Sequence, residues 1–223
     1  MTQLPGHFGN LVPRLRTLVD ERRSVIGQGM LPLPTQAAWF SEPESWDDAD
    51  GKLVVNAPAH SDLFSDPGGA AAVTNAPMLL APAPDGDWMF SARIDVDFAS
   101  TFDAGVLVLH AGDGEWAKLC FELAPQVHPM VVSVVTRDGT SDDANAFAVD
   151  TDEIWLRVSR LGPAVAFHAS TDGEWWQLVR YFAFTPQAQV GLLAQSPTGD
   201  GVRVEFSELT FTSERLRDLR DGS

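Results

Sequence analysis

The chain has 223 residues, of which 44% are hydrophobic, and 31 acidic against 15 basic residues give it a formal net charge of −16. Because proteins that bind nucleic acid or anionic membranes present basic surfaces to phosphate groups, this charge argues against both kinds of partner. The single cysteine, Cys120, excludes a disulfide within the chain.

The first 34 residues are expected to form a helical segment and a linker. Within residues 10–26, Asn10 can cap a helix, and apolar residues recur on one face at helical spacing. The LPLP sequence at 31–34 is typical of a stiff, proline-rich linker. We expect the amphipathic helix to pack on the rest of the protein or on a second chain, which makes an oligomer possible.

The N-terminal sequence MTQLPGHFGN lacks the basic start and the apolar run of a signal peptide. No apolar stretch approaches the roughly 18 residues that a membrane-spanning helix needs. We therefore expect a cytoplasmic protein without a membrane partner.

Residues 35–213 predict one all-β domain, an antiparallel sandwich or jelly roll, followed by a short tail at 214–223. Asp-Gly pairs, which are a strong hairpin signal, occur at 85–86, 113–114, 138–139 and 172–173. The short apolar or alternating runs are 88–98, 104–110, 116–123, 130–136, 153–160, 164–170, 175–182, 188–195 and 202–211. So many closely spaced strands favour two packed antiparallel sheets.

The run EWAKLCFEL at 115–123 predicts a strand with two different faces, because successive side chains in a strand point to opposite sides. One face is apolar, with Ala117, Leu119, Phe121 and Leu123, and the other carries Trp116, Lys118, Cys120 and Glu122. The run 153–160 repeats this asymmetry, with Trp155 and Arg157 on its polar face. A solvated outer face explains such alternation. A tryptophan is costly to expose, however, so we treat the polar face as a candidate binding surface.

Several short motifs follow one another along the chain. They are Ser61-Asp62-Leu63-Phe64, Phe102-Asp103-Ala104-Gly105, Trp116-Ala117-Lys118 with Glu122, Ser133-Val134-Val135-Thr136, Ser141-Asp142, Trp155-Leu156-Arg157, Ser170-Thr171-Asp172-Gly173 with Trp176 and Arg180, and Val190-Gly191 with Ser196-Pro197. In this order the motifs resemble the DUF1349 family, which is also labelled "regulation of enolase 1, concanavalin A-like". The resemblance implies a concanavalin A-like antiparallel sandwich. Folds of that class often hold carbohydrate on a concave sheet, but a fold does not fix a function.

Two positions depart from the pattern of the resembled family. The family usually has a glutamine before its Ala-Gly pair, whereas here Asp103 is followed directly by Ala104. The family's Ser-Asp-Trp is Ser141-Asp142-Asp143 here, without the aromatic residue.

The polar faces suggest a binding site on the concave sheet. Tryptophan rings would stack on the C–H faces of a sugar, cations would donate hydrogen bonds to its hydroxyl groups, and carboxylates would accept them. Asp62 also fits a second role, as a turn residue that accepts backbone N–H bonds. Salt bridges on a partly covered sheet would equally explain the charged residues. The candidate ligand-binding residues are Trp116, Lys118, Glu122, Trp155, Arg157, Asp103 and Asp62.

Three functions remain open at this point. The first is a non-catalytic domain that binds a carbohydrate or sugar-like ligand. The second is a protein–protein adaptor that regulates a metabolic enzyme, since the family label indicates such a role and the chain has seven tryptophans, a residue enriched at interface hot spots. The third is a glycoside hydrolase, which needs two carboxyl groups. Glu122 could pair with Asp95, Asp97 or Asp103, but the Glu-x-Asp-x-(x)-Glu pattern of laminarinase-like enzymes is missing.

We expect neither a metal nor a cofactor. None of the five histidines shows metal-ligand spacing with another or with Cys120. The DDADG sequence at 47–51 lacks the later acidic residue of a calcium loop, and no glycine-rich phosphate loop is present.

Overall fold

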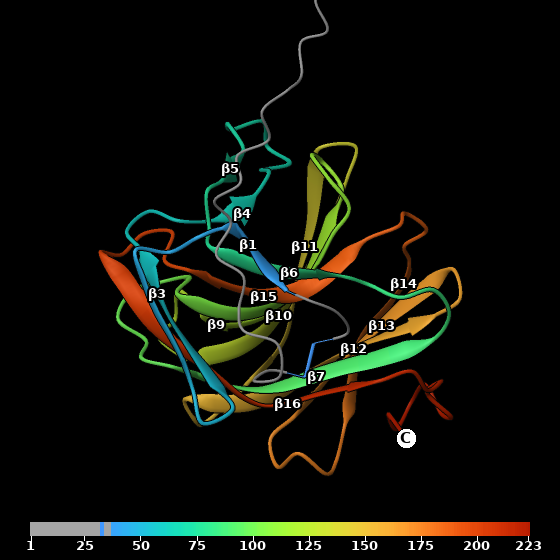
Figure 1. Ribbon diagram of the computed structural model, residues 1–223. Helices are drawn as coiled ribbons and strands as arrows, with labels where there is room; N and C mark the ends of the chain where they lie inside the picture. The colour runs from blue at the N-terminus through green and yellow to red at the C-terminus, as the bar shows by residue number, and fades with distance from the viewer. Residues whose placement is uncertain (1–31, 34–36) are drawn as a thin grey trace, which may run out of the picture.

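The computed structural model describes residues 32–33 and 37–223, which form a two-layer antiparallel β-sandwich (Figure 1). The expected all-β sandwich is thereby confirmed. The helix expected over residues 10–26 lies outside the described residues. Within residues 32–33 and 37–223, no helix is long and apolar enough to cross a membrane.

Each layer is a seven-stranded sheet whose neighbouring strands are antiparallel. Sheet A consists, in spatial order, of β1 (Ala38–Ser41), β6 (Met78–Pro82), β15 (Gln189–Gln195), β8 (Ala104–His110), β9 (Trp116–Leu123), β10 (Pro129–Arg137) and β11 (Thr140–Ala148). Sheet B consists of β14 (Gln177–Ala183), β13 (Ala164–Ser170), β12 (Glu153–Leu161), β7 (Trp88–Val96), β16 (Gly201–Thr212), β3 (Lys52–Pro58) and β2 (Ser45–Ala49). A small pair, β4 (Leu63–Phe64) and β5 (Val73–Thr74), lies on the side of sheet A that faces away from sheet B (Figure 1).

The main hydrophobic core fills the space between the two sheets. From β9 it includes Ala117, Leu119 and Phe121, three of the four residues expected on the apolar face of this strand. Gly105 in β8 allows the sheets to approach closely, because a Cβ atom there would lie 2.3 Å from Cγ2 of Ile94 in β7. The glycine of one sequence motif is therefore required by the packing of sheet A against sheet B.

The outer face of sheet A carries a second, smaller apolar cluster. Val106, Trp116, Cys120 and Val132 are buried there beside Leu63 from β4. The cover comes from the chain between β3 and β6, which leaves sheet B, forms β4 and β5, and then enters sheet A. Strand β9 is therefore buried on both faces, although one of its faces contains charged residues.

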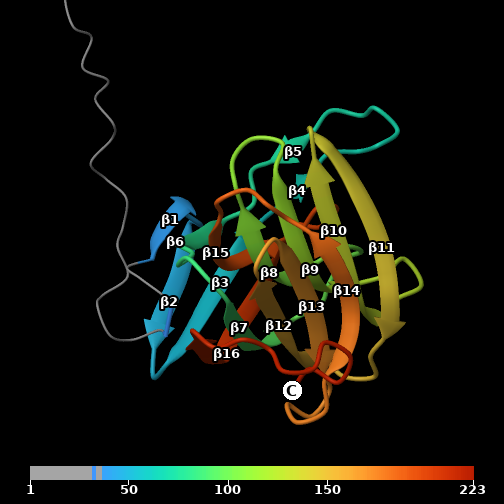
Figure 2. The same ribbon diagram turned by 90° about the vertical axis from the view of Figure 1, so that its right-hand side faces the viewer.

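Three of the four Asp-Gly pairs form the expected hairpin turns, which join β8 to β9, β10 to β11 and β13 to β14. The pair at 85–86 lies instead where the chain passes from β6 in sheet A to β7 in sheet B. Strand β11, TSDDANAFA, is absent from the expected runs because it is a polar edge strand with mostly exposed side chains. Figure 2 shows β11 and β14 at the same edge of the sandwich, where Arg180 donates to Asp142 at 2.8 Å.

Candidate functional site

A pocket of about 150 Å³ opens on the outer face of sheet A. Strand β9 contributes two charged side chains to it, and the chain around β4 contributes two more residues. The lining residues are Asp62, Phe64, Phe102, Lys118, Glu122, Val134, Asp143 and Gln195. Three of the predicted site residues, Asp62, Lys118 and Glu122, therefore meet in one pocket.

The register of sheet A explains why these side chains converge. Lys118 pairs with Val134 of β10, which in turn pairs with Asp143 of β11. Glu122 pairs with Ala104 of β8, and Ala104 pairs with Gln195 of β15. Because directly paired residues in antiparallel strands point to the same face, the two rows bring polar groups from three strands, β9, β11 and β15, to one surface.

Lys118 is a buried cation at the base of this pocket, with only 2% of its surface exposed. Its Nζ donates to Oε1 of Gln195 at 3.0 Å and to Oδ1 of Asp62 at 3.4 Å. Burial favours the neutral form of the amine. Nearby acidic groups outweigh burial, among them Asp62, which acts both through its charge and through its hydrogen bond, so the pKa of Lys118 is raised and the group is charged at neutral pH.

Glu122 is a carboxyl group that its surroundings hold in the protonated form. Burial is the main cause, and together with the charges of Asp143 and Asp62 it raises the pKa of Glu122 to about 8, although Lys118 acts in the opposite direction. Among the described residues, no side chain or backbone group forms a hydrogen bond with the Glu122 carboxyl. At neutral pH this group can therefore donate a hydrogen bond to a ligand as well as accept one.

We expect Glu122→Gln to change how stability depends on pH. A carboxyl whose pKa is higher in the folded protein binds its proton more tightly there, so its contribution to stability falls as the pH rises from about 4.5 to about 8. Glutamine cannot ionise. The Tm of the variant minus the Tm of wild type should therefore increase across this window. Thermal unfolding at several pH values measures it, with Glu44→Gln at an exposed position as the control. A difference independent of pH would contradict the assignment.

Two phenylalanines flank the polar groups of the pocket. Phe102 is 37% exposed and its φ is +71°, in the left-handed region that residues other than glycine rarely adopt. Its backbone N–H donates to the carbonyl of Leu123 at 2.8 Å, and its carbonyl accepts a bond from Nε2 of Gln195 at 3.4 Å. Sequence reasoning missed Phe64 and Phe102, although each lies within a motif quoted above.

Asp103 occupies a different position from the one expected. It is fully buried, and its carboxylate accepts bonds from the N–H groups of Ala99 at 3.0 Å and Ser100 at 2.7 Å, and from the hydroxyl of Ser196 at 2.6 Å. The carboxylate is used to fix the loop that carries Phe102, so Asp103 supports the pocket without lining it.

Asp62 combines the two roles considered for it. Its Oδ1 accepts the backbone N–H of Leu63 at 2.7 Å, as a turn residue would. The same oxygen contacts Lys118, and the side chain lines the pocket. The backbone N–H of Asp62 also donates to Oδ1 of Asn75 at 3.0 Å, which ties β4 to the chain that follows β5.

Trp116 lies on the outer face of sheet A as expected, but it is buried, with 2% exposure. It lines a separate cavity of about 310 Å³. The chain at 62–65 alternates between the two cavities, since Asp62 and Phe64 line the first and Leu63 and Ser65 line the second. The indole of Trp116 is therefore not a stacking surface for a ligand beside Glu122, and the expectation that it is one was wrong. The alternation of polar and apolar residues along β9 does not reveal that β4 covers this part of the sheet.

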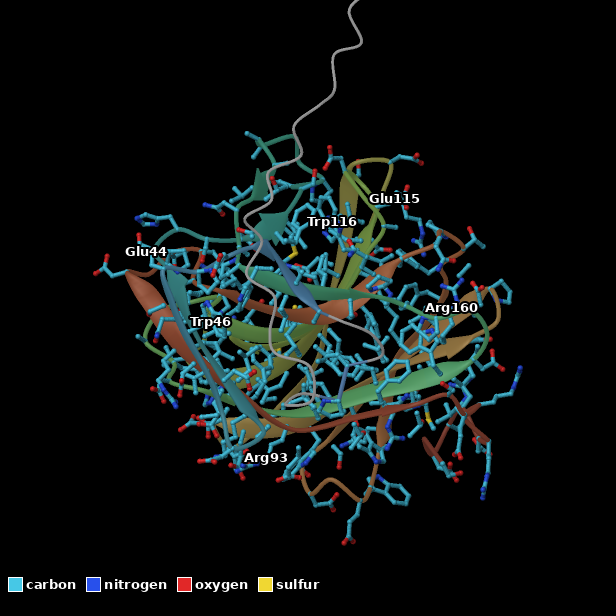
Figure 3. All side chains as sticks on the ribbon, in the orientation of Figure 1. Glu44, Trp46, Arg93, Glu115, Trp116 and Arg160 are labelled. Atoms are coloured by element: carbon cyan, nitrogen blue, oxygen red, sulfur yellow. The ribbon has the colours of Figure 1, made fainter. Side chains whose placement is uncertain are left out.

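The expectation that Trp155 and Arg157 lie near the Lys118 face was also wrong. Both residues are on β12 of sheet B, and they point outward because the intervening Leu156 is in the core. The ring of Trp155 lies 5.4 Å from the guanidinium of Arg93. Figure 3 shows Arg93 on the opposite side of the molecule from Trp116.

Arg157 holds the C-terminal tail against sheet B. Its guanidinium lies 3.6 Å from the ring centroid of Trp176 and donates to the carbonyl of Gly222. The ring of His168, on the paired strand β13, contacts the carbonyl of Leu219 at 2.9 Å. These contacts account for the side chain of Arg157 without a ligand.

The carboxyl groups near Glu122 are not the ones considered for a hydrolase. Asp95 is in β7 of sheet B, and Asp97 follows the same strand. The carboxyl groups that share the pocket with Glu122 are those of Asp62 and Asp143. Within residues 32–33 and 37–223, no group of three histidine, cysteine, aspartate or glutamate side chains is placed to hold a metal ion.

Comparison with known proteins gives a family and a relative. The family model described as "Protein of unknown function (DUF1349)" matches residues 39–214. The chain is 26% identical over 192 residues to "Regulation of enolase protein 1" of Saccharomyces cerevisiae, and this alignment covers 85% of this chain and 96% of that protein. A crystal structure of a functionally unknown protein from Saccharomyces cerevisiae matches with a TM-score of 0.74 and 25% identity, covering 80% of this chain and 96% of that one.

Proteins that act on or bind carbohydrate share the fold at lower identity. A xylan beta-1,4-xylosidase from Bacillus halodurans C-125 matches with a TM-score of 0.66 and 14% identity, over 95% of this chain and 41% of that one. The carbohydrate binding module CBM66 from Bacillus subtilis matches with a TM-score of 0.52 and 15% identity, over 78% of this chain and 95% of that one. At these identities the likeness shows a common fold.

Proposed function

The chain belongs to the DUF1349 family, and from this premise we propose that it is a non-catalytic binding domain that recognises a carbohydrate or sugar-like polyol in the pocket on sheet A. The proposal rests on one observation: the pocket combines hydrogen-bonding groups with two aromatic rings, of which Phe102 is exposed and Phe64 is partly buried. Sugars present hydroxyl groups at their edges and C–H groups on their faces, so they need both kinds of contact.

The polar groups of the pocket suit hydroxyl groups in both directions. Lys118 has three N–H donors, of which two have protein acceptors, Asp62 and Gln195. The protonated carboxyl of Glu122 adds a donor and an acceptor beside it. Because Lys118 is buried and held by two partners, this arrangement is fixed before the ligand arrives, which lowers the cost of binding.

The aromatic groups supply the apolar contact. Both phenylalanines line the pocket: Phe102 is partly exposed, and Phe64 is contributed by β4. The pocket volume of about 150 Å³ suits a single sugar ring rather than a chain of several. The carbohydrate-binding module that shares the fold supports the proposal as an analogy of fold only.

A thermal-shift screen against monosaccharides and polyols tests the proposal, since a ligand that binds only the folded protein raises Tm. We expect at least one sugar to raise the Tm of wild type. Phe102→Ala should weaken the binding of that sugar by about fivefold, because stacking contributes on the order of 1 kcal/mol. The control is Trp175→Ala, which removes another exposed aromatic ring, 67% exposed, from the β13–β14 turn of sheet B. Equal weakening by both variants, or no shift with any sugar, would refute the proposal.

A protein-binding role is the second candidate. It is supported by the name of the yeast relative, which describes regulation of enolase, and by two exposed aromatic side chains, Trp175 at 67% and Tyr181 at 52%. Aromatic residues of this kind are enriched at interface hot spots. If no sugar shifts the Tm, a binding assay with purified enolase, comparing wild type with Trp175→Ala, separates this role from the first.

A further inference from the structure

The charges around the proposed sugar pocket are unequal. Three carboxyl groups line it, those of Asp62, Glu122 and Asp143, against the single ammonium group of Lys118. Two phenylalanine rings and the amide of Gln195 complete the polar and apolar walls, so the carboxyl groups belong to a formed pocket and not to an exposed acidic loop.

The nearby cations already have carboxylate partners. Lys118 Nζ lies 3.4 Å from Oδ1 of Asp62, and Arg180 Nη2 lies 2.8 Å from Oδ2 of Asp142. In the part of the chain that the structure describes, the other two carboxyl groups of the pocket form no ion pair. Among the described residues, Glu122 and Asp143 therefore line the pocket without an ion-pair partner of their own.

The protonation behaviour of these two carboxyl groups agrees with the geometry. Burial, reinforced by neighbouring carboxylates, raises the pKa of Glu122 to about 8. Burial also raises the pKa of Asp143, although Lys118 and Arg180 act in the opposite direction. Carboxyl groups that lack counter-charges respond in this way, and a cation brought close to them favours their ionised form.

This arrangement selects among sugar derivatives by charge. A phosphate group carries about 1.5 to 2 negative charges at neutral pH and would meet three carboxyl groups in this pocket. Lys118 offers it one N–H donor, and the charge of Lys118 is already partly neutralised by Asp62. A neutral sugar satisfies the hydrogen bonds but supplies no positive charge, whereas an ammonium group supplies it and can also lie against an aromatic face such as Phe64.

We infer that the ligand of this pocket is a polyol that carries a primary ammonium group, a member of the amino-sugar class. The inference rests on the proposed function, because it names the ligand class of the same pocket. The hydroxyl groups of the ligand face Lys118 and Gln195, and its ammonium group lies between Glu122 and Asp143.

Proton release accompanies this mode of binding. The ammonium group favours the ionised form of Glu122, so the carboxyl proton passes to the buffer when the ligand binds. The charged groups that face Glu122 are Lys118 on its own strand, Asp143 on β11 and Asp62 before β4. A neutral sugar in the same place leaves the proton on the carboxyl group.

The test compares glucosamine, glucose and glucose 6-phosphate by titration calorimetry at pH 6.5, where the amine is protonated. We expect glucosamine to bind at least about tenfold more tightly than glucose, and glucose 6-phosphate to bind more weakly than both. The apparent binding enthalpy of glucosamine should differ between two buffers of unequal ionisation enthalpy, because the buffer takes up the proton that Glu122 releases. The double variant Glu122→Gln, Asp143→Asn should bind glucosamine and glucose equally, whereas Glu44→Gln, which removes a distant surface charge, should not change the preference.

The outcomes separate this inference from the proposed function. Equal affinity of wild type for glucosamine and glucose, or tighter binding of glucose 6-phosphate, overturns the inference and leaves sugar binding in place. Absence of binding by all three hexoses, together with no hit in the sugar screen, overturns both. Thermal unfolding of the double variant shows that any loss of preference occurs in a folded protein.

Discussion

Asp103→Ala should lower the free energy of unfolding by about 3 to 5 kcal/mol, because the substitution removes a fully buried acceptor of three hydrogen bonds and leaves the buried hydroxyl of Ser196 without its partner. The carboxylate is completely buried and accepts two backbone N–H bonds and one hydroxyl bond. Urea unfolding followed by tryptophan fluorescence measures the change. Ligand binding should weaken as well, since the loop held by Asp103 carries Phe102.

A matched control for this prediction is Asp172→Ala. Asp172 likewise accepts bonds from two backbone N–H groups, those of Glu174 and Trp175, and from the hydroxyl of Ser170. Its carboxylate is exposed in a hairpin turn, so water can replace it as the acceptor. The loss should be much smaller than for Asp103. Similar losses for the two variants would show that burial does not decide the cost.

Lys118→Met should lower the free energy of unfolding by about 3 kcal/mol, because it removes one partner of a buried ion pair and leaves the carboxylate behind. Methionine keeps the apolar part of the side chain, so the loss reports the charge and its hydrogen bonds to Asp62 and Gln195. The loss should be greatest above about pH 8, where Glu122 is ionised and lacks its counter-charge. Chemical unfolding at two pH values measures both effects.

The control for Lys118 is Lys52→Met on sheet B. Lys52 also forms an ion pair, with Glu205 at 2.6 Å, but its side chain is 51% exposed. Exposed pairs of this kind contribute about 0 to 1 kcal/mol. If Lys118→Met cost no more than Lys52→Met, the buried ammonium group would not be part of the structure that shapes the pocket.

The sandwich was predictable because its strands have clear boundaries. The runs 104–110, 116–123 and 164–170 coincide with β8, β9 and β13, since turn residues delimit each of them. Alternation also identified the residues of β9 that share a face. Alternation could not assign a strand to a sheet, because outward-facing residues recur at every second position in both sheets. For this reason the expectation that Trp155 and Arg157 lie beside β9 was wrong.

The pocket was predictable only in part, because it depends on contacts between distant segments. Lys118 and Glu122 were found through their strand, and Asp62 through a motif. Phe102 owes its position to a left-handed backbone conformation and Gln195 to the end of a different strand, and neither has a periodic signal. The motifs SDLF and FDAG nevertheless contained both aromatic residues of the pocket, so ordered motifs carried information that the alternation did not.

The single cysteine gives this protein a reporter of its own opening. Cys120 is completely buried in the middle of β9, and burial raises the pKa of its thiol. Alkylating reagents attack the thiolate, so they modify Cys120 only in molecules that have opened around the central strands of sheet A. The rate at which Cys120 is alkylated, measured by mass spectrometry, therefore reports how often the protein opens. It can be compared between wild type and the variants above, and with and without a bound sugar. Because the chain has one cysteine, the measurement also works in a crude extract.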